Sequence, residues 1–217
     1  MPNREAYINP SLDEIEPGLY LGNARSSTSL ATLREYQILA MVSLGTEERH
    51  LFIPSLDSST RNLLQHVTEA CDFIERVRLS SVERPALLAS VYTNLEEQPL
   101  EVETIAAAEV HRSNNVILVH CDWGVLRSST IVIAYLMRKH RMSLSDALAM
   151  VKGKRRVRPN LNFIMQLEVW QDTGYEIYED VETKTPKLQY KEFLEKRAKR
   201  LKEQGLTGDE PIAPVFP

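Results

Sequence analysis

Cysteine is scarce in this sequence, since the 217 residues include only Cys71 and Cys121. Two cysteines exclude a disulfide framework and a zinc module built from several thiolates. His66, His111 and His140 show no metal-ligand spacing. We therefore expect no metal and no cofactor, and a reducing compartment, cytoplasmic or nuclear, as the place of action.

Long apolar runs are also missing. No stretch approaches the roughly 18 apolar residues of a membrane-spanning helix, and the first segment, MPNREAYINPSLDEIEPG, lacks the basic-then-apolar pattern of a signal peptide. The net charge of −4 gives no general reason for nucleic-acid binding. We expect neither a membrane nor a nucleic acid as a partner.

What the sequence does contain is an alternation of apolar patterns. Strands are expected at 19–21, 39–44, 50–56 and 115–121, and helices at 26–38, 59–77, 128–140, 143–154 and after Pro159. The run NVILVHC at 115–121 is almost entirely apolar, which is typical of a central strand buried on both faces. The alternation predicts an α/β fold, a three-layer sandwich whose central, mostly parallel sheet is flanked by helices.

The charge pattern divides the chain into one domain, 1–177, and an extension, 178–217. Residues 79–114 fit neither pattern and are interpreted as an insertion within the domain. A lysine-rich helix around 190–202 could dock on the domain, bind a protein partner or stay in solvent, and solvent is the default. The Gly- and Pro-containing end after this helix is expected to be disordered.

The chemistry is concentrated in VHCDWGVLRSS, at 119–129, where the central strand leads into a helix. Cys121 lies at the carboxyl edge of the sheet, where open α/β folds bind ligands. The loop N–H groups and the helix N-terminus form an anion site, and Arg127 can clamp two phosphate oxygens. Gly124 permits a conformation or a close approach that a Cβ would hinder. The expected phosphate-binding residues are Asp122, Trp123, Gly124, Val125, Leu126 and Arg127.

This setting favours the thiolate of Cys121, a nucleophile suited to phosphoryl transfer onto sulfur. Ser128 can hydrogen-bond to the sulfur and help it leave, and His120 can orient the loop through its backbone. A cysteine at a strand end, taken alone, is more often a small core residue. The coincidence of Cys121, Gly124, Arg127 and Ser128 favours the phosphate cradle.

At these residues the sequence resembles a known family. HCDWGVLRS is similar to the signature of the cysteine-dependent protein-tyrosine phosphatase superfamily, and more narrowly to the small atypical dual-specificity phosphatases. IEPGLYLGN resembles the first strand of that family, and the segment from AYLMRKH to MQLEVW resembles its helices after the catalytic loop. The resemblance covers about 15–175 apart from 79–114. It implies a protein-tyrosine-phosphatase-like fold and hydrolysis of phosphotyrosine and phosphoserine or phosphothreonine in proteins through a cysteinyl-phosphate.

The resemblance also supplies a general acid. The segment IPSLDSSTRNLLQHVTEACDFI matches the family's acid loop and the helix after it, which places Asp57 in this role. From spacing alone, Asp57 would more readily be an N-cap or turn residue. As the acid, it protonates the leaving oxygen and then acts as the base on water. The expected catalytic residues are Cys121, Arg127, Asp57 and Ser128.

Three loop residues depart from the family pattern. Trp123 and Leu126 stand where small residues and serine are common, and Asp122 adds a negative charge beside the phosphate. Trp123 could narrow access, form a stacking wall or simply pack on a neighbouring loop. The crowded rim keeps open an alternative function, a phospho-binding scaffold with little turnover. The absence of lysine from the loop argues against a lipid headgroup as substrate.

Further residues have two interpretations each. The cationic run Lys152–Arg158 either complements a helix dipole on the surface or forms a basic rim for acidic phosphopeptides. Asn160 either caps the next helix or braces the catalytic loop, and bracing is favoured. Cys71 is expected in the core rather than as a redox partner of Cys121.

Overall fold

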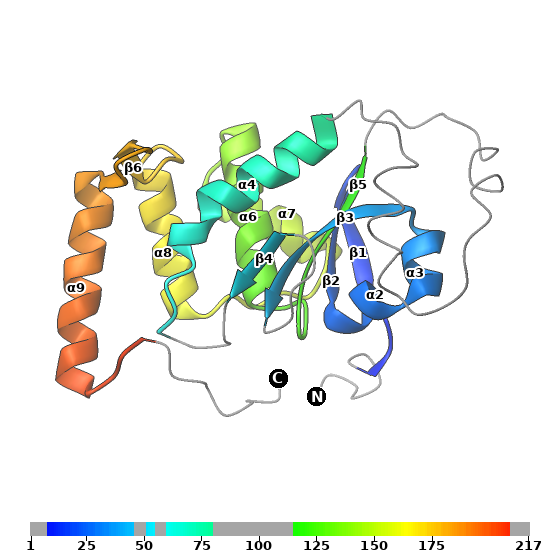
Figure 1. Cartoon of the computed structure of the whole chain (residues 1–217), viewed down its shortest axis with the longest axis horizontal. Coiled ribbons are helices and arrows are strands. Elements are labelled where there is room, and N and C mark those ends of the chain that lie inside the picture. The colour runs from blue at the N-terminus through cyan, green and yellow to red at the C-terminus, as the bar shows by residue number, and fades with distance from the viewer. Residues whose placement is uncertain (1–7, 46–50, 55–59, 80–114, 209–217) are drawn as a thin grey trace.

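The structure of this protein, a computed structural model, describes residues 8–45, 51–54, 60–79 and 115–208. The described sheet has five strands in the order β1-β2-β5-β3-β4 (Figure 1). Its strands are β1 Leu12–Glu16, β2 Leu19–Asn23, β3 Ile38–Gly45, β4 Leu51–Pro54 and β5 Val116–Cys121. Only the edge pair β1–β2 is antiparallel; the other three pairs are parallel. The predicted mostly parallel sheet is confirmed, with β5 at its centre.

Helices lie on both faces of this sheet. They are α2 Ala24–Thr28, α3 Leu30–Glu35, α4 Leu64–Leu79, α6 Arg127–His140, α7 Leu144–Lys154, α8 Leu161–Asp172 and α9 Leu188–Gln204. Figure 1 shows α2 and α3 on one side of the sheet, α4, α6, α7 and α8 on the other, and α9 outside α8. The three-layer α/β sandwich is therefore confirmed. The single helix expected at 26–38 is instead two short helices, divided at Ser29, whose side chain accepts from the N–H of Thr32.

The central strand β5 is buried on both faces, as its apolar sequence predicted. Ile117 and Val119 belong to the large core beneath α4 and α6. Leu118 belongs to a smaller core on the other face, with Leu33 and Ile38. Because side chains alternate along a strand, Cys121 falls on the α6 side at the carboxyl edge of the sheet.

Strand β1 was not predicted. It lies at the edge of the sheet, where Leu12 faces Gly22 of β2 and Asp13 faces Leu21. Only its last two residues, Ile15 and Glu16, are buried. A strand with so little buried apolar surface has no clear alternating pattern in the sequence.

The helix expected to stay in solvent packs on the domain instead. After a short hairpin, β6 Tyr178–Asp180 with β7 Thr185–Pro186, α9 buries Tyr190 and Phe193. The Arg197 guanidinium donates to the carbonyl oxygen of Thr60 from Nε at 3.1 Å and Nη2 at 2.8 Å. An amphipathic helix with two aromatic residues on its apolar face gains more from burial than from solvation.

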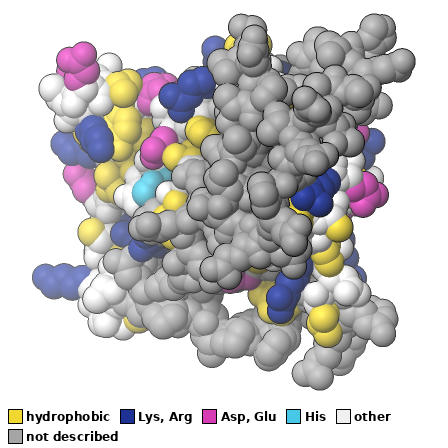
Figure 2. All heavy atoms as spheres, turned by 45° about the vertical axis from the view of Figure 1, so that its right-hand side comes forward, with side chains coloured by type: hydrophobic (Ala, Val, Ile, Leu, Met, Phe, Trp, Pro, Cys, Tyr) yellow, Lys and Arg dark blue, Asp and Glu magenta, His cyan; other side chains and the backbone are white. Residues whose placement is uncertain are grey.

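Most of the expected insertion, from residue 80 to 114, lies outside the described residues. Within the described part of the chain, no helix is long and apolar enough to cross a membrane. In the same part, no group of three or more His, Cys, Asp or Glu side chains could hold a metal ion. Figure 2 shows Lys and Arg side chains together with Asp and Glu side chains around the described margin of one face.

Candidate active site

Cys121 is the last residue of β5 and is almost completely buried. The Ser128 hydroxyl, one residue into α6, donates a hydrogen bond to its Sγ at 3.1 Å. A hydroxyl donor next to a sulfur stabilises negative charge on that sulfur. The structure thus brings together two of the four expected catalytic residues across the strand–loop–helix turn.

The loop between β5 and α6 turns its carbonyl groups outward. Four consecutive carbonyl oxygens accept from residues outside the loop: Asp122 from the N–H of Ala24 at 3.3 Å, Trp123 from Arg155 Nη2 at 3.5 Å, Gly124 from Arg155 Nε at 3.0 Å, and Val125 from the N–H of Arg158 at 3.0 Å. In a trans peptide the N–H points opposite to the C=O of the same unit. The N–H groups of residues 123–126 are therefore turned away from these donors, which is the arrangement that a cradle for an anion needs.

Gly124 meets both conditions that favour glycine. Its φ of +67° lies in the left-handed region, which side chains rarely adopt. A Cβ on Gly124 would also lie 2.4 Å from the carbonyl oxygen of Gly22 in β2. The loop can approach the sheet this closely only with glycine here.

Arg127 is buried at the start of α6, and its side chain is only 1% exposed. Its Nη1 donates to the carbonyl oxygen of Leu44 at the end of β3, at 3.2 Å. Its Nη2 forms an ion pair with Asp122 Oδ2 at 2.6 Å. The carboxylate expected beside the phosphate thus contacts the guanidinium, and 60% of the Asp122 side chain is exposed to solvent. Arg127 is anchored on one side by the sheet and paired with Asp122 on the other.

His120 and Asn160, the two supporting residues, make well-defined contacts. His120 Nε2 lies 2.7 Å from Ser43 Oγ and so joins the ends of β5 and β3. Asn160 is the N-cap of α8, and its side chain accepts from the N–H of Phe163 at 2.9 Å. The expected contact of Asn160 with the loop is made instead by the nearby backbone of Arg158. Capping competes with bracing because one short amide side chain reaches only its own helix end.

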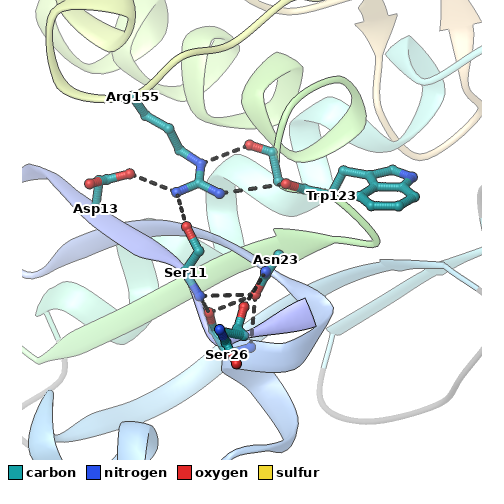
Figure 3. Close-up of polar contacts among 8 residues, drawn as sticks. Ser11, Asp13, Asn23, Ser26, Trp123 and Arg155 are labelled. Atoms are coloured by element: carbon teal, nitrogen blue, oxygen red, sulfur yellow. Dashed lines mark hydrogen bonds and ion pairs between the residues drawn. The ribbon is translucent and has the colours of Figure 1, made fainter. Parts of the chain in front are cut away.

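The unusual residues Trp123 and Leu126 differ in their surroundings. Leu126 packs against the large core beside the start of α6. Trp123 is partly exposed, and Figure 3 shows its indole directed away from the guanidinium of Arg155. Both side chains are partly exposed, and of the two it is Leu126 that packs on the core.

Asp57, the expected general acid, lies outside the described residues. The chain that follows it is firmly held: Gln166 Oε1 accepts from the N–H groups of Leu63 and Leu64 at 2.7 and 2.9 Å. Gln166 Nε2 donates to the carbonyl oxygen of Arg61 at 2.9 Å. The start of α4 is therefore fixed to α8 next to the segment that contains Asp57.

Cys71 belongs to the core, as expected. It is fully buried in α4, and burial raises the pKa of its thiol to about 12. A thiol that stays protonated at neutral pH is a poor nucleophile and a poor redox partner.

The contact of Arg155 with the loop, and its pairing with Asp13, were not predicted from the sequence. Arg155 lies within the cationic run Lys152–Arg158, yet its side chain is only 9% exposed and pairs with Asp13 in β1. Five basic residues in seven positions carry no periodic signal that distinguishes the one directed inward. No strand was predicted at Asp13, so no contact of Asp13 with a neighbouring element could be inferred.

The comparisons with known proteins agree with this geometry. The family model "Dual specificity phosphatase, catalytic domain" matches residues 91–173, which include the loop and α6 to α8. Dual specificity protein phosphatase MPK-4 of Drosophila melanogaster is 34% identical over 77% of this chain and 38% of its own length. Dual specificity protein phosphatase 1 of Arabidopsis thaliana is 32% identical over 73% of this chain and 67% of its own.

The fold has solved counterparts as well. The Yvh1 phosphatase domain of Chaetomium thermophilum aligns with a TM-score of 0.57 at 24% identity, over 76% of this chain and 97% of that domain. The chain spans well under half of the Drosophila relative but two thirds of the Arabidopsis one. From the fold, the loop and these relatives together, the chain belongs to the dual specificity phosphatase family.

Proposed function

We propose that this protein is a cysteine-dependent dual-specificity phosphatase that hydrolyses phosphotyrosine and phosphoserine or phosphothreonine in proteins. The observation that carries the proposal is the Cys121 Sγ, which accepts from Ser128 beneath a loop with outward carbonyls. The buried Arg127 is held between the carbonyl oxygen of Leu44 and the carboxylate of Asp122. A thiolate, a ring of N–H donors and a guanidinium suit a phosphate dianion and an in-line attack on phosphorus.

The reaction proceeds in two balanced steps. In the first, the Cys121 thiolate forms a P–S bond as the P–O bond to the leaving group breaks, and Asp57 gives its proton to the leaving oxygen. In the second, Asp57 takes a proton from water, the water oxygen attacks phosphorus, and the P–S bond breaks. The Ser128 hydroxyl stabilises the thiolate that leaves in this second step.

The proposal also includes the substrates and the compartment in which the protein acts. The substrates are phosphorylated proteins, and the place of action is the cytoplasm or the nucleus. Trp123, at the surface of the loop, is the residue best placed to influence which phosphorylated side chain is accepted. Any protein partner of the extension would use the exposed face of α9, since its apolar face is buried on the domain.

The test is hydrolysis of an aryl phosphate by the purified protein. Wild-type protein should turn over steadily, Cys121→Ser should be inactive, and Asp57→Asn should lower kcat about 100-fold while phosphate still binds. An unchanged rate in Asp57→Asn would remove Asp57 from the acid role. Tight phosphopeptide binding without turnover or a phosphoenzyme would favour the alternative of a phospho-binding scaffold.

A further inference from the structure

Arg155 occupies an unusual place for a residue in a cationic surface run. It follows the last residue of α7 as the C-cap, with extended backbone at φ −141° and ψ 140°. Its N–H donates to the carbonyl oxygen of Val151 at 2.9 Å. Helix α7 therefore ends at Arg155, and the Arg155 side chain is directed toward the loop after β5 instead of into solvent.

The guanidinium of Arg155 links the loop to the N-terminal edge of the sheet (Figure 3). On the loop side, Nε donates to the carbonyl oxygen of Gly124 at 3.0 Å and Nη2 to that of Trp123 at 3.5 Å. On the β1 side, Nη1 donates to Asp13 Oδ2 at 2.6 Å and to Ser11 Oγ at 3.1 Å. One planar group thus serves two consecutive loop carbonyls and two anchors, which the fork of arginine donors permits.

The anchors on the β1 side are themselves held. The N–H of Ser11 donates to Asn23 Oδ1 at 3.2 Å and to Ser26 Oγ at 2.9 Å. Asn23 is also the N-cap of α2, and its side chain accepts from the N–H of Ser26. Arg155 is therefore tied to a fixed point of the sheet and its neighbouring helix.

These contacts determine the direction of two peptide groups. The Trp123 carbonyl shares its peptide plane with the N–H of Gly124, and the Gly124 carbonyl shares its plane with the N–H of Val125. Drawing both carbonyls toward Arg155 directs both N–H groups to the opposite side, because the peptide unit is planar and trans. We infer that Arg155, anchored by Asp13, is a positioning residue that aims the N–H groups of Gly124 and Val125 at the substrate phosphate.

Geometry and charge make different predictions for this residue. If Arg155 acted only through its positive charge, lysine would replace it, and removing the neighbouring exposed charge of Arg156 would have a similar effect. If it acts through its donors, lysine fails, because one ammonium cannot hold two carbonyls and a carboxylate in the same plane. Arg155→Lys is therefore the informative variant, and Arg156→Met is the matched control for charge.

This inference rests on the proposed function, so the experiment measures both in the whole 217-residue chain. Inorganic phosphate is titrated into wild-type protein and each variant by calorimetry, and the Gly124 and Val125 amide signals are followed by ¹H–¹⁵N NMR. Arg155→Met and Arg155→Lys should each weaken phosphate binding about tenfold and reduce the phosphate-induced shifts of these two amides. Asp13→Asn should cause the same change to a smaller degree, and Arg156→Met should remain close to wild type.

The outcomes separate the two proposals. Wild-type protein that neither binds phosphate nor hydrolyses an aryl phosphate would overturn the proposed function. Wild-type protein that does both, with unchanged phosphate affinity and amide shifts in Arg155→Lys, would overturn only the positioning role of Arg155. Equal losses in Arg156→Met and Arg155→Met would also overturn it, because charge alone would then explain the effect. If Arg155→Met fails to fold, Arg155→Lys and Asp13→Asn carry the same test.

Discussion

At the scale of single residues, the phosphate loop depends on a place where two backbones nearly touch. Gly124 in the loop and Gly22 in β2 are both glycines, and a Cβ on either would meet neighbouring atoms at 3.0 Å or less. The Gly124 contact involves backbone, which cannot move aside as a flexible side chain can. This close approach keeps the loop against the sheet while its N–H groups remain available to an anion.

Gly124→Ala should therefore disrupt the loop. The new Cβ would lie 2.4 Å from the Gly22 carbonyl oxygen and require an unfavourable φ, so we expect a loss of phosphate binding and about 2 kcal/mol of stability. Gly153→Ala is the matched control, because a Cβ added at Gly153 would have no atom within 4 Å, and alanine favours the helix. Urea denaturation and aryl phosphate turnover measure both effects. Similar results for the two variants would contradict this account.

The catalytic loop could be predicted from sequence because its residues are close along the chain. Cys121, Gly124, Arg127 and Ser128 lie within eight consecutive positions, 121–128, where a strand leads into a helix. The Asp13–Arg155 contact joins residues 142 positions apart, and only the folded sheet brings them together. The capping role of Asn160 was visible as an alternative, but local spacing could not decide between a cap and a brace.

At the scale of elements, α9 extends the domain instead of leaving it. Asn62 Nδ2 donates to the Tyr190 hydroxyl at 3.1 Å, and Arg197 donates twice to the Thr60 carbonyl oxygen. Both contacts fall just before α4, on the chain that leads from Asp57. Helix α9 thus holds this segment at Thr60 and Asn62. Gln166 of α8 holds it one and two residues later, at the N–H groups that lead into α4.

Arg197→Met should lower stability by about 1–2 kcal/mol, because two hydrogen bonds from a charged group are lost. Aryl phosphate turnover should fall as well, since Thr60 lies three residues after Asp57. Lys199→Met is the control, as the Lys199 side chain is 80% exposed on the same helix. Urea denaturation and steady-state kinetics test the pair. An Arg197 variant with unchanged stability would show that α9 is only loosely attached.

The elements themselves were largely predictable where apolar residues recur with a clear period. Strands β2, β3, β4 and β5 and helices α4, α6, α7 and α8 lie close to the expected ranges. Strand β1 and the β6–β7 hairpin bury little apolar surface and left no such signal. The packing of α9 could not be predicted because its charged face dominates its composition, while burial depends on a complementary surface elsewhere in the fold.

At the scale of the whole molecule, a buried ionic cluster joins three elements at the end of β1. Glu16 accepts from Arg78 at the end of α4 and from Lys139 and His140 at the end of α6. Burial would raise the pKa of Glu16, but the hydrogen bonds from Lys139 and His140 and the charge of Arg78 outweigh it and hold the pKa below its ordinary value. The cationic residues also suit the negative ends of the two helix dipoles.

Stability should consequently depend on pH through Glu16. A pKa that is lowered by folding gives stabilisation that is present above the ordinary pKa and is lost as pH falls through the folded value. Glu16→Gln should be less stable than wild type by about 3 kcal/mol at pH 7, and the difference should shrink toward acid pH. Thermal denaturation from pH 7 to pH 3 measures this, with Glu192→Gln as control, because the Glu192 side chain is 52% exposed on α9. A constant difference across this range would contradict the assignment.

The contact between Arg155 and the loop has a consequence for the order in which the protein becomes functional during synthesis. The hydrogen bond to the Gly124 carbonyl comes from Arg155, which is synthesised 31 positions later. Asp13, which anchors Arg155, is synthesised near the beginning of the chain. A nascent chain that ends before residue 155 already contains the nucleophile, yet it lacks the group that directs two of the loop amides. The loop therefore reaches its full affinity for phosphate only after Arg155 has been synthesised and α7 has packed beside β1.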